Sequence, residues 1–139
     1  MRTRPPGSLG RNDAPRIMII DDHEISRTAF RALLRSEGVD VVADLSADRD
    51  VLTMARALRP EVVIVDVTPA ADTGFSIARR LRALLPAPPI VILTSSTDRT
   101  RFGARLDGHE FIAKADIRSA AIARLARSPE TDGLGSRNP

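Results

Sequence analysis

Five polar side chains in this sequence of 139 residues are of the kinds that carry phosphate chemistry: Asp21, Asp22, Asp66, Thr94 and Lys114. Carboxylates held close together repel one another, and a proton or a hard divalent cation such as Mg2+ must relieve the repulsion. A carboxylate that stays free can attack a phosphoryl group, while the metal and an ammonium group neutralise charge on the phosphoryl oxygens. The residue types therefore indicate magnesium-assisted phosphoryl transfer.

Lys114 and Thr94 would stabilise the product of such a transfer. Lys114 is the single lysine among 21 Lys and Arg residues, so the chain departs here from its habit of using arginine. A compact ammonium charge differs from the planar guanidinium fork, and we interpret the lysine as a requirement of the site. The hydroxyl of Thr94 can donate a hydrogen bond to an acyl phosphate and be pulled inward, which would couple the chemistry to a loop movement.

The segments between these residues predict the elements that position them. Short runs rich in Val and Ile alternate with segments whose apolar residues recur at three and four positions, which is typical of an α/β fold. Right-handed crossovers would then give a parallel sheet covered by helices on both faces. Strands are expected at 16–20, 39–43, 62–65, 90–93 and 110–113, and helices at 24–36, 48–58, 73–85, 99–106 and 117–126.

The first helix and the third strand carry the clearest apolar patterns. The helix is expected to bury a face of Ile25, Ala29, Leu33 and Leu34 and to end at Gly38. The run 62–65 is the most apolar in the chain, which is typical of a central strand buried on both faces.

Each candidate residue follows or ends a predicted strand. Asp21 and Asp22 come after the first strand, Asp66 after the third, Thr94 after the fourth and Lys114 after the fifth. Open α/β sheets bind ligands in the crevice beyond the carboxyl ends of their strands. We therefore expect these side chains to meet on one edge of the sheet.

Composition limits the other possibilities. No apolar run approaches the ~20 residues of a membrane span, and the first residues lack a secretory signal, so a cytoplasmic location is the default. The absence of cysteine excludes disulfides and thiolate chemistry. The net charge is +3, but the arginines are spread along the chain and only four Phe are available for stacking. We expect no direct binding of nucleic acid and no membrane partner.

The length fits one domain. The folded unit is expected at 15–127, because the segments 1–14 and 128–139 lack the periodic apolar residues that offset ordering entropy. We expect the first segment to be a disordered tail and the last to be a flexible tail or linker.

Four motifs resemble the response-regulator receiver family over about 15–127. They are Ile-Ile-Asp-Asp-His, Val-Ile-Val-Asp, Val-Ile-Leu-Thr-Ser and Phe-Ile-Ala-Lys, in the family's order and at nearly its spacing. Four motifs in order are a specific signal. The Asp-Asp-His opening and the stretch Leu-Arg-Pro-Glu-Val-Val look most like the NarL-like subgroup. The resemblance implies a flavodoxin-like (βα)5 three-layer sandwich, with a five-stranded parallel sheet of order 2-1-3-4-5.

The resemblance also implies a role for each acidic residue. Asp66 would be the phosphoacceptor. Asp22 and Asp66 would bind Mg2+ together with the backbone carbonyl of Thr68, and Asp21 would act through a water molecule. The phosphoryl donor would be a sensor histidine kinase. By the same resemblance the chain would be a signalling switch that assists its own phosphorylation and dephosphorylation, rather than an enzyme.

The switch itself is implied in the same way. Lys114 would bind a phosphate oxygen, and Thr94 and Phe111 would move as a pair. The fourth helix, fifth strand and fifth helix would then signal to an output domain or a partner, and a homodimer is compatible with this role. NarL-like regulators continue into a helix-turn-helix DNA-binding domain, so this sequence is expected to be a stand-alone receiver or part of a longer regulator.

Each candidate also has a purely structural explanation. Asp21 and Asp22 could cap the first helix, where carboxylates satisfy free amides. Thr94 could simply begin a turn, and Phe111 could pack in the core as readily as act in a switch. For Asp66 the functional explanation is favoured, because a carboxylate straight after a buried strand is costly unless paired or metal-bound. His23 and His109 are expected to have loop or surface roles, without a zinc site.

Departures from the family pattern leave two alternatives open. Pro69 comes one residue earlier than the usual proline while Gly74 keeps its place, and the fourth helix is expected to be short or irregular. A receiver-like interaction module that does not use phosphorylation would tolerate both changes. A haloacid-dehalogenase-like phosphatase would use similar residue types, but such enzymes place a second Asp where this chain has Thr68.

Overall fold

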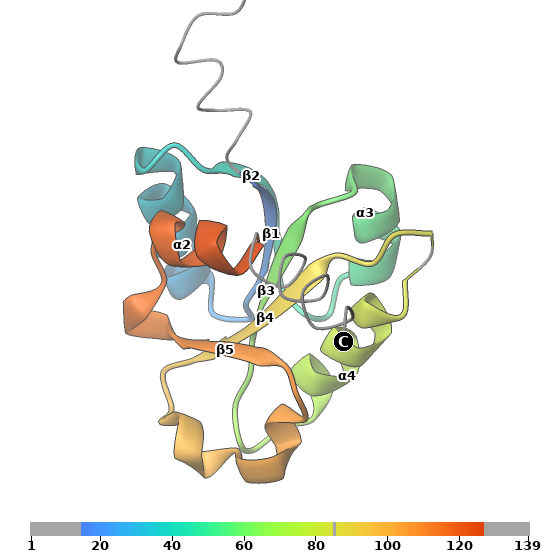
Figure 1. Ribbon diagram of the computed structural model, residues 1–139, viewed down its shortest axis with the longest axis vertical. Helices are drawn as coiled ribbons and strands as arrows, with labels where there is room; N and C mark the ends of the chain where they lie inside the picture. The colour runs from blue at the N-terminus through green and yellow to red at the C-terminus, as the bar shows by residue number, and fades with distance from the viewer. Residues whose placement is uncertain (1–14, 85, 127–139) are drawn as a thin grey trace, which may run out of the picture.

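The computed structural model describes residues 15–84 and 86–126. The tails predicted at 1–14 and 128–139 lie outside the described residues. One five-stranded parallel sheet runs through the molecule in the order β2-β1-β3-β4-β5 (Figure 1). The predicted fold class and strand order are therefore confirmed. Its strands are β1 Arg16–Ile20, β2 Asp40–Leu45, β3 Val62–Asp66, β4 Ile90–Ser95 and β5 Glu110–Ala113.

The strands extend further toward the candidate site than the apolar runs predict. In β4, Thr94 pairs with Asp66 of β3, and Ser95 pairs with Ala113 of β5. Backbone pairing thus continues past the Val and Ile residues that mark the strand in the sequence. As a result, Thr94 belongs to a strand rather than to the turn that follows it.

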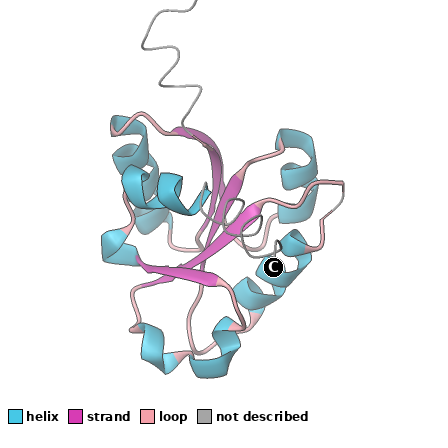
Figure 2. Ribbon diagram, viewed as in Figure 1, coloured by secondary structure: helices cyan, strands magenta, loops and turns pink. Residues whose placement is uncertain are grey.

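Helices lie on both sides of the sheet (Figure 2). α2 (Glu24–Ser36) and the helical residues 119–126 cover one face, and α3 (Val51–Leu58) and α4 (Thr73–Arg82) cover the other (Figure 1). Two apolar clusters follow this division, one with Phe30 and Leu34 of α2, the other with residues of α3 and α4. The three layers of the predicted sandwich are confirmed. No helix within residues 15–84 and 86–126 has the length and apolar character needed to cross a membrane.

The third strand behaves as a central strand should. Val63 and Val65 belong to one apolar cluster and Val62 and Ile64 to the other, and all four are fully buried. Side chains of a strand alternate between its two faces, so an uninterrupted apolar run contributes side chains to the apolar clusters on both faces of the sheet. This strand fixes Asp66 in the middle of the sheet.

The face that α2 buries differs from the prediction. Leu34 is buried as predicted, but Ile25 is 87% exposed and Ala29 is exposed, and Phe30 is buried in their place. The inward stripe runs through Ser26, Phe30 and Leu34, one residue later than the stripe that begins at Ile25. One residue corresponds to about 100° of helix rotation. The rotation turns Ser26 toward the carboxyl edge of the sheet. Gly38, with φ +87°, follows the end of the helix as expected.

Helix boundaries differ where local hydrogen bonds decide them. α3 begins at Val51 rather than at 48, because the Asp50 carboxylate accepts a hydrogen bond from the Thr53 amide and caps the helix. α4 ends at Arg82. The fourth helix expected at 99–106 consists of two short 3-10 turns, η1 (Arg99–Arg101) and η2 (Gly103–Leu106), which confirms that this segment is irregular.

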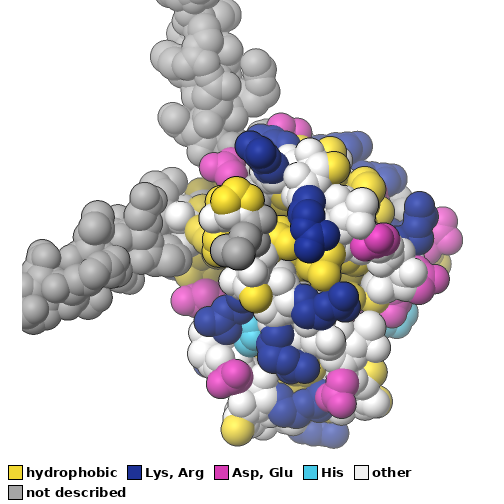
Figure 3. Space-filling model, turned by 90° about the vertical axis from the view of Figure 1, so that its right-hand side faces the viewer, with side chains coloured by type: hydrophobic (Ala, Val, Ile, Leu, Met, Phe, Trp, Pro, Cys, Tyr) yellow, Lys and Arg dark blue, Asp and Glu magenta, His cyan; other side chains and the backbone are white. Residues whose placement is uncertain are grey.

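Arginine side chains gather on the side of the molecule formed by α3 and α4, which faces the viewer in Figure 3. Exposed members on these two helices are Arg56, Arg79, Arg80 and Arg82. The sequence shows how many arginines there are, but the helix packing decides that these share one face. That the chain does not bind nucleic acid directly stays a prediction.

Gly74 lets the first turn of α4 approach the end of β3. A Cβ atom at this position would lie 2.8 Å from the backbone oxygen of Asp66 and 2.8 Å from a side-chain carbon of Val67. Real Cβ contacts are not that short, and a backbone oxygen within a paired strand cannot move aside. The glycine is therefore required by a close approach between backbones.

We expect Gly74→Ala to lower the free energy of unfolding by about 1–3 kcal/mol, as overpacked sites do. A loss of stability would be informative, because replacing glycine by alanine in a helix interior otherwise stabilises the helix by about 1 kcal/mol. Urea unfolding measures the change. Gly38→Ala is the control: nothing lies within 4 Å of its Cβ, so its cost arises from positive φ alone and should leave the amide resonances of Asp66 and Val67 in place. A stabilised Gly74→Ala variant would contradict the close contact.

Candidate functional site

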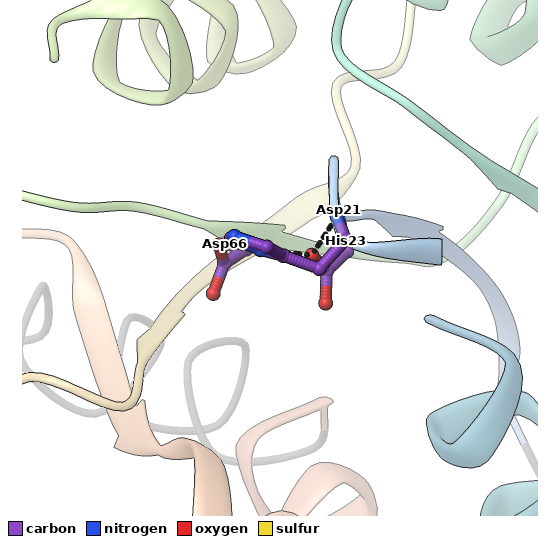
Figure 4. A group of neighbouring side chains, drawn as sticks. All are labelled: Asp21, His23 and Asp66. Carbon is purple, nitrogen blue, oxygen red and sulfur yellow. Dashed lines mark hydrogen bonds and ion pairs between the residues drawn. The ribbon is translucent and has the colours of Figure 1, made fainter. Parts of the chain in front are cut away.

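The candidate residues converge at the carboxyl edge of the sheet. Asp21 follows β1, Asp66 is the last residue of β3, and Lys114 follows β5. Figure 4 shows Asp21 and Asp66 approaching each other from separate strands, with His23 between them. The juxtaposition expected from the strand ends is present.

Lys114 joins the two carboxylates. Its Nζ lies 2.9 Å from Oδ1 of Asp66 and 3.2 Å from Oδ2 of Asp21, and it donates a further hydrogen bond to Oγ of Ser26 at 3.1 Å. Burial lowers the pKa of Lys114, but the hydrogen bond and charge of Asp66, with those of Asp21, raise it above its usual value overall. The site therefore contains a fixed positive charge.

Asp21 is the better stabilised of the two acids. The residue is only 1% exposed, and its carboxylate accepts hydrogen bonds from the His23 amide at 2.9 Å and from the Ser26 hydroxyl at 2.8 Å. Burial raises the pKa of Asp21, yet these hydrogen bonds together with Lys114 hold it below its usual value. Asp21 is thus a stable anion inside the protein.

Asp66 is the less stabilised acid. Its side chain is 8% exposed. Burial raises its pKa, the charge of Asp21 raises it further, and Lys114 and His23 oppose the shift without cancelling it. One lysine is shared by two carboxylates, so Asp66 carries negative charge that is only partly neutralised. A cation or an electrophile close to Asp66 would be stabilised by this charge.

The donor atoms fit a hard divalent cation. Ligand atoms of Asp21, His23 and Asp66 lie within 4.8 Å of one another. Carboxylate oxygens are the ligands that Mg2+ prefers, and the uncompensated charge at Asp66 would favour its binding. His23 adds a nitrogen donor, whose Nδ1 is 3.3 Å from Asp21 and 4.0 Å from Asp66.

Two of the residues predicted to bind the metal make other hydrogen bonds, and the carboxylate of Asp22 is not part of this cluster. Asp22 is exposed, and its Oδ1 accepts a hydrogen bond from the Ala47 amide at 2.6 Å. The carbonyl of Thr68 accepts a long hydrogen bond from the Ala71 amide, at 3.4 Å. The structure thus brings Asp21 rather than Asp22 next to Asp66 and Lys114. Roles for Asp22 and Thr68 in metal binding stay predictions.

Thr94 carries a hydroxyl without a partner. The residue is fully buried, and its Oγ1 has no hydrogen bond to any group in the described part of the chain. An unpaired buried hydroxyl costs roughly 1–3 kcal/mol, so its presence calls for an explanation. Thr94 lies opposite Asp66 in the β3–β4 pairing. A group attached to Asp66 would therefore be bound next to the strand position that carries this hydroxyl.

Phe111 belongs to a row of three aromatic rings whose middle member, Phe102, lies between the η1 and η2 turns. Its ring centroid is 5.9 Å from that of Phe102, which is 5.8 Å from that of Phe75. Phe111 is only partly buried, whereas Phe75 and Phe102 are core residues. Both explanations of Phe111, core packing and movement in a switch, are compatible with this position.

Sequence reasoning missed Ser26 and did not foresee that His109 is buried. Ser26 contacts both Asp21 and Lys114, but its proximity depends on the rotation of α2 that the apolar pattern did not reveal. His109 lies in the loop before β5, as one of its two expected roles requires, but it is buried at 7% exposure rather than on the surface, with Nε2 3.5 Å from Arg82. Burial, and then the charge of Arg82, lowers its pKa. His23 is 67% exposed, which agrees with its predicted surface role.

A five-stranded parallel sheet that gathers an acidic pair and a lysine at its carboxyl edge is the arrangement of a receiver domain. The model of the response regulator receiver domain matches residues 17–125. The chain belongs to the response regulator receiver domain family, as the four motifs predicted. Receiver domains of two-component response regulators bind Mg2+ at their acidic pocket and are phosphorylated by sensor histidine kinases.

Curated relatives support this assignment over part of their length. The transcriptional activator DevR/DosR of Mycobacterium tuberculosis is 29% identical over 114 residues, which are 81% of this chain and 52% of the relative. The response regulator GacA of Pseudomonas aeruginosa is 32% identical over 80 residues, covering 57% of this chain and 37% of the relative. The chain thus spans about half or less of the length of these relatives.

Solved structures give the same result. The signal receiver domain of NarL from Mycobacterium tuberculosis is 27% identical with a TM-score of 0.63, covering 81% of this chain and 96% of that chain. The BeF3-activated receiver domain of Klebsiella pneumoniae RstA is 26% identical with a TM-score of 0.62, covering 81% and 98%. NarL-type proteins are thus among the relatives, and the match favours a receiver over the phosphatase alternative.

The raised pKa of Asp66 makes the protein's stability depend on pH in a defined direction. Because the folded-state pKa lies above the unfolded value of 3.8, ionisation of Asp66 opposes folding at neutral pH. The penalty is absent below the unfolded pKa and develops as pH rises through the folded pKa. In the absence of Mg2+, we expect Asp66→Asn to unfold at a higher temperature than the wild type at pH 7, by a few degrees for each ~0.5–1 kcal/mol relieved.

Thermal unfolding at pH 7 and near pH 4 tests this expectation. The difference between the wild type and Asp66→Asn should shrink toward pH 4, since the wild-type carboxyl then binds its own proton. Asp40→Asn, which removes an exposed carboxylate near the opposite edge of the sheet, should leave no such pH-dependent difference. A destabilised Asp66→Asn at pH 7 would show that the ion pair with Lys114 outweighs the burial of Asp66.

Proposed function

We propose that Asp66 accepts a phosphoryl group from a phosphohistidine of a sensor histidine kinase. The observation that supports this most is the partly compensated charge of Asp66, held 2.9 Å from the ammonium of Lys114. An ionised carboxylate can act as the nucleophile, and the neighbouring ammonium then offsets the negative charge that the phosphoryl group brings to the site. The unpaired hydroxyl of Thr94 supplies a second group that phosphorylation would satisfy.

The proposed step is an in-line phosphoryl transfer from phosphohistidine to Asp66. A carboxylate oxygen of Asp66 attacks phosphorus in line with the phosphorus–nitrogen bond, which breaks and returns its electron pair to the imidazole. The imidazole nitrogen recovers a proton from water, and Asp66 becomes an acyl phosphate. Lys114 neutralises charge on a phosphoryl oxygen throughout the transfer.

Four groups are proposed to hold the magnesium ion: the carboxylates of Asp22 and Asp66, the carbonyl of Thr68, and Asp21 through water. When bound, Mg2+ supplies charge neutralisation at the phosphoryl oxygens. Asp22 would have to exchange its hydrogen bond from the Ala47 amide for the cation. The exposed position of Asp22 makes that exchange possible without repacking of the core.

Signalling is proposed to follow from the response of Thr94. Its hydroxyl turns toward the phosphoryl group, and Phe111 moves inward into the space that it leaves. The surface that changes comprises the η1 and η2 turns, β5 and the helical residues 119–126, where an output domain, a partner or a second copy of the chain would bind. In this role the chain acts as a switch in the cytoplasm, rather than as an enzyme that turns over substrate.

Phosphorylation can be tested with a small acyl-phosphate donor and Mg2+. We expect mass spectrometry to detect one added phosphoryl group on the wild type, none on Asp66→Asn, and wild-type labelling on the control Asp40→Asn. Labelling on another residue, or none on the folded wild type, would contradict the proposal. If a beryllofluoride phosphate mimic also left the spectrum unchanged while a partner still bound, the interaction-module alternative would be favoured.

Thr94→Val separates phosphorylation from the switch. Valine has nearly the volume of threonine and removes the unpaired hydroxyl, so we expect the unphosphorylated variant to be more stable by about 1 kcal/mol. Labelling of Asp66 should persist, while the change in the Phe111 ring resonances on phosphorylation should be lost. Thr97→Val, at a half-buried position beyond β4, is the matched control and should keep the ring response. A Thr94→Val variant with a normal ring response would exclude Thr94 from the switch.

A further inference from the structure

The loop that follows the phosphoacceptor strand is held by one distant side chain. Arg105, in the η2 turn, donates from Nη1 to the carbonyl of Pro69 at 2.8 Å. Its Nη2 donates to the carbonyl of Ala71 at 2.9 Å and to Oδ1 of Asp72 at 2.7 Å. A single guanidinium therefore binds three acceptors of the loop 67–72, which lies more than thirty residues away in sequence.

The side chain of Arg105 is itself fixed in place. Its guanidinium carbon lies 4.5 Å from the ring centroid of Phe75, a core residue in the first turn of α4. A cation over an aromatic face is attracted to the ring by its quadrupole. The loop and the aromatic ring together hold the guanidinium on two sides. This arrangement suits a planar fork with five donors, which a lysine cannot reproduce.

The anchored carbonyl of Pro69 restricts the peptide that precedes it. Proline fixes its own φ near −65°, so the Thr68–Pro69 peptide can turn relative to Pro69 only to a small extent. Arg105 fixes the other side of Pro69 by binding its carbonyl. The Thr68 carbonyl lies in that peptide and also accepts the long hydrogen bond from the Ala71 amide, at 3.4 Å, so Arg105 restricts its direction together with that bond. Among the described residues, no other side chain donates to the carbonyls of this loop.

We propose that Arg105 is a positioning residue for the magnesium site, which orients the Thr68 carbonyl by clamping the loop 67–72. This inference rests on the proposed function, because it assumes that the Thr68 carbonyl binds the metal. Its consequence is that a residue of the irregular segment between β4 and β5 controls the affinity for Mg2+. The metal site and the segment expected to change on signalling are thereby joined through one side chain.

Whether loss of Arg105 weakens or strengthens Mg2+ binding distinguishes a positioning role from a purely electrostatic one. Removing a positive charge near an acidic site should by Coulomb's law strengthen cation binding slightly, and salt screens the effect. Losing a group that orients a ligand weakens metal binding, roughly 10–100-fold in metalloproteins. We therefore expect Arg105→Gln to raise the dissociation constant for Mg2+ by about tenfold.

The experiment is a Mg2+ titration of the whole chain, followed by calorimetry and by the amide resonances of Val67 and Thr68, with no phosphoryl donor present. Arg101→Gln is the matched control, since this exposed arginine of η1 loses the same charge without touching the loop. It should bind Mg2+ as tightly as the wild type or slightly more tightly. Arg105→Lys keeps the charge but not the fork, so its affinity should fall as that of Arg105→Gln does.

Hydrogen exchange of the loop amides gives a second readout. In Arg105→Lys, whose aliphatic stem can still pack on Phe75, the amide of Ala71 should exchange faster than in the wild type while the amides of β3 stay protected. This variant keeps the test valid if Arg105→Gln fails to fold. Unchanged exchange together with unchanged Mg2+ affinity would overturn the inference.

The outcomes also distinguish this inference from the proposed function. If the wild type binds Mg2+ and both Arg105 variants bind it equally well, or if only the charge-removing variant differs, Arg105 does not position the site and the role of Asp66 is unaffected. If the wild type itself binds no Mg2+, the metal-assisted proposal for Asp66 fails, and the role of Arg105 fails with it. Weaker binding by both variants, with Arg101→Gln unchanged, supports the clamp.

Discussion

The rest of the site depends on one shared interaction, the ammonium of Lys114 between the carboxylates of Asp21 and Asp66. One ammonium charge cannot neutralise two buried carboxylates. Because hydrogen bonds stabilise the charge of Asp21, the negative charge that is not neutralised lies mainly on Asp66. The interaction joins residues that follow β1, β3 and β5 at one edge of the sheet. It therefore links stability, metal binding and reactivity, because each of them changes the charge balance at Asp66.

Backbone geometry around Asp66 is as constrained as its charge. Gly74 allows α4 to approach the end of β3, and the loop between them is clamped from the side by Arg105. Pro69, which comes one residue earlier than is usual in the family, takes part in this clamp because its carbonyl accepts one of the hydrogen bonds from Arg105. A loop that departs from the family pattern is thus stabilised by hydrogen bonds from a side chain of the η2 turn.

The segment between β4 and β5 combines several unusual features. Two 3-10 turns replace a regular helix, His109 is buried beside Arg82, and the rings of Phe75, Phe102 and Phe111 form a row. Aromatic rings packed against one another shift as a group, because close-packed cores deform little without repacking. In the proposed switch, a change at Thr94 would reach the surface through this aromatic row rather than through a rigid helix.

The sequence by itself determined the fold class, the strand order through its family motifs, and the edge of the sheet at which Asp21, Asp66, Thr94 and Lys114 meet. These follow from local apolar periodicity and from the rule that parallel strands end on one side. Only the tertiary structure decided that α2 buries Phe30 rather than Ile25, that Ser26 contacts the site, that His109 is buried, and that Arg105 reaches Pro69. Helix rotation and contacts between distant segments depend on packing in three dimensions, which no local pattern of residues records.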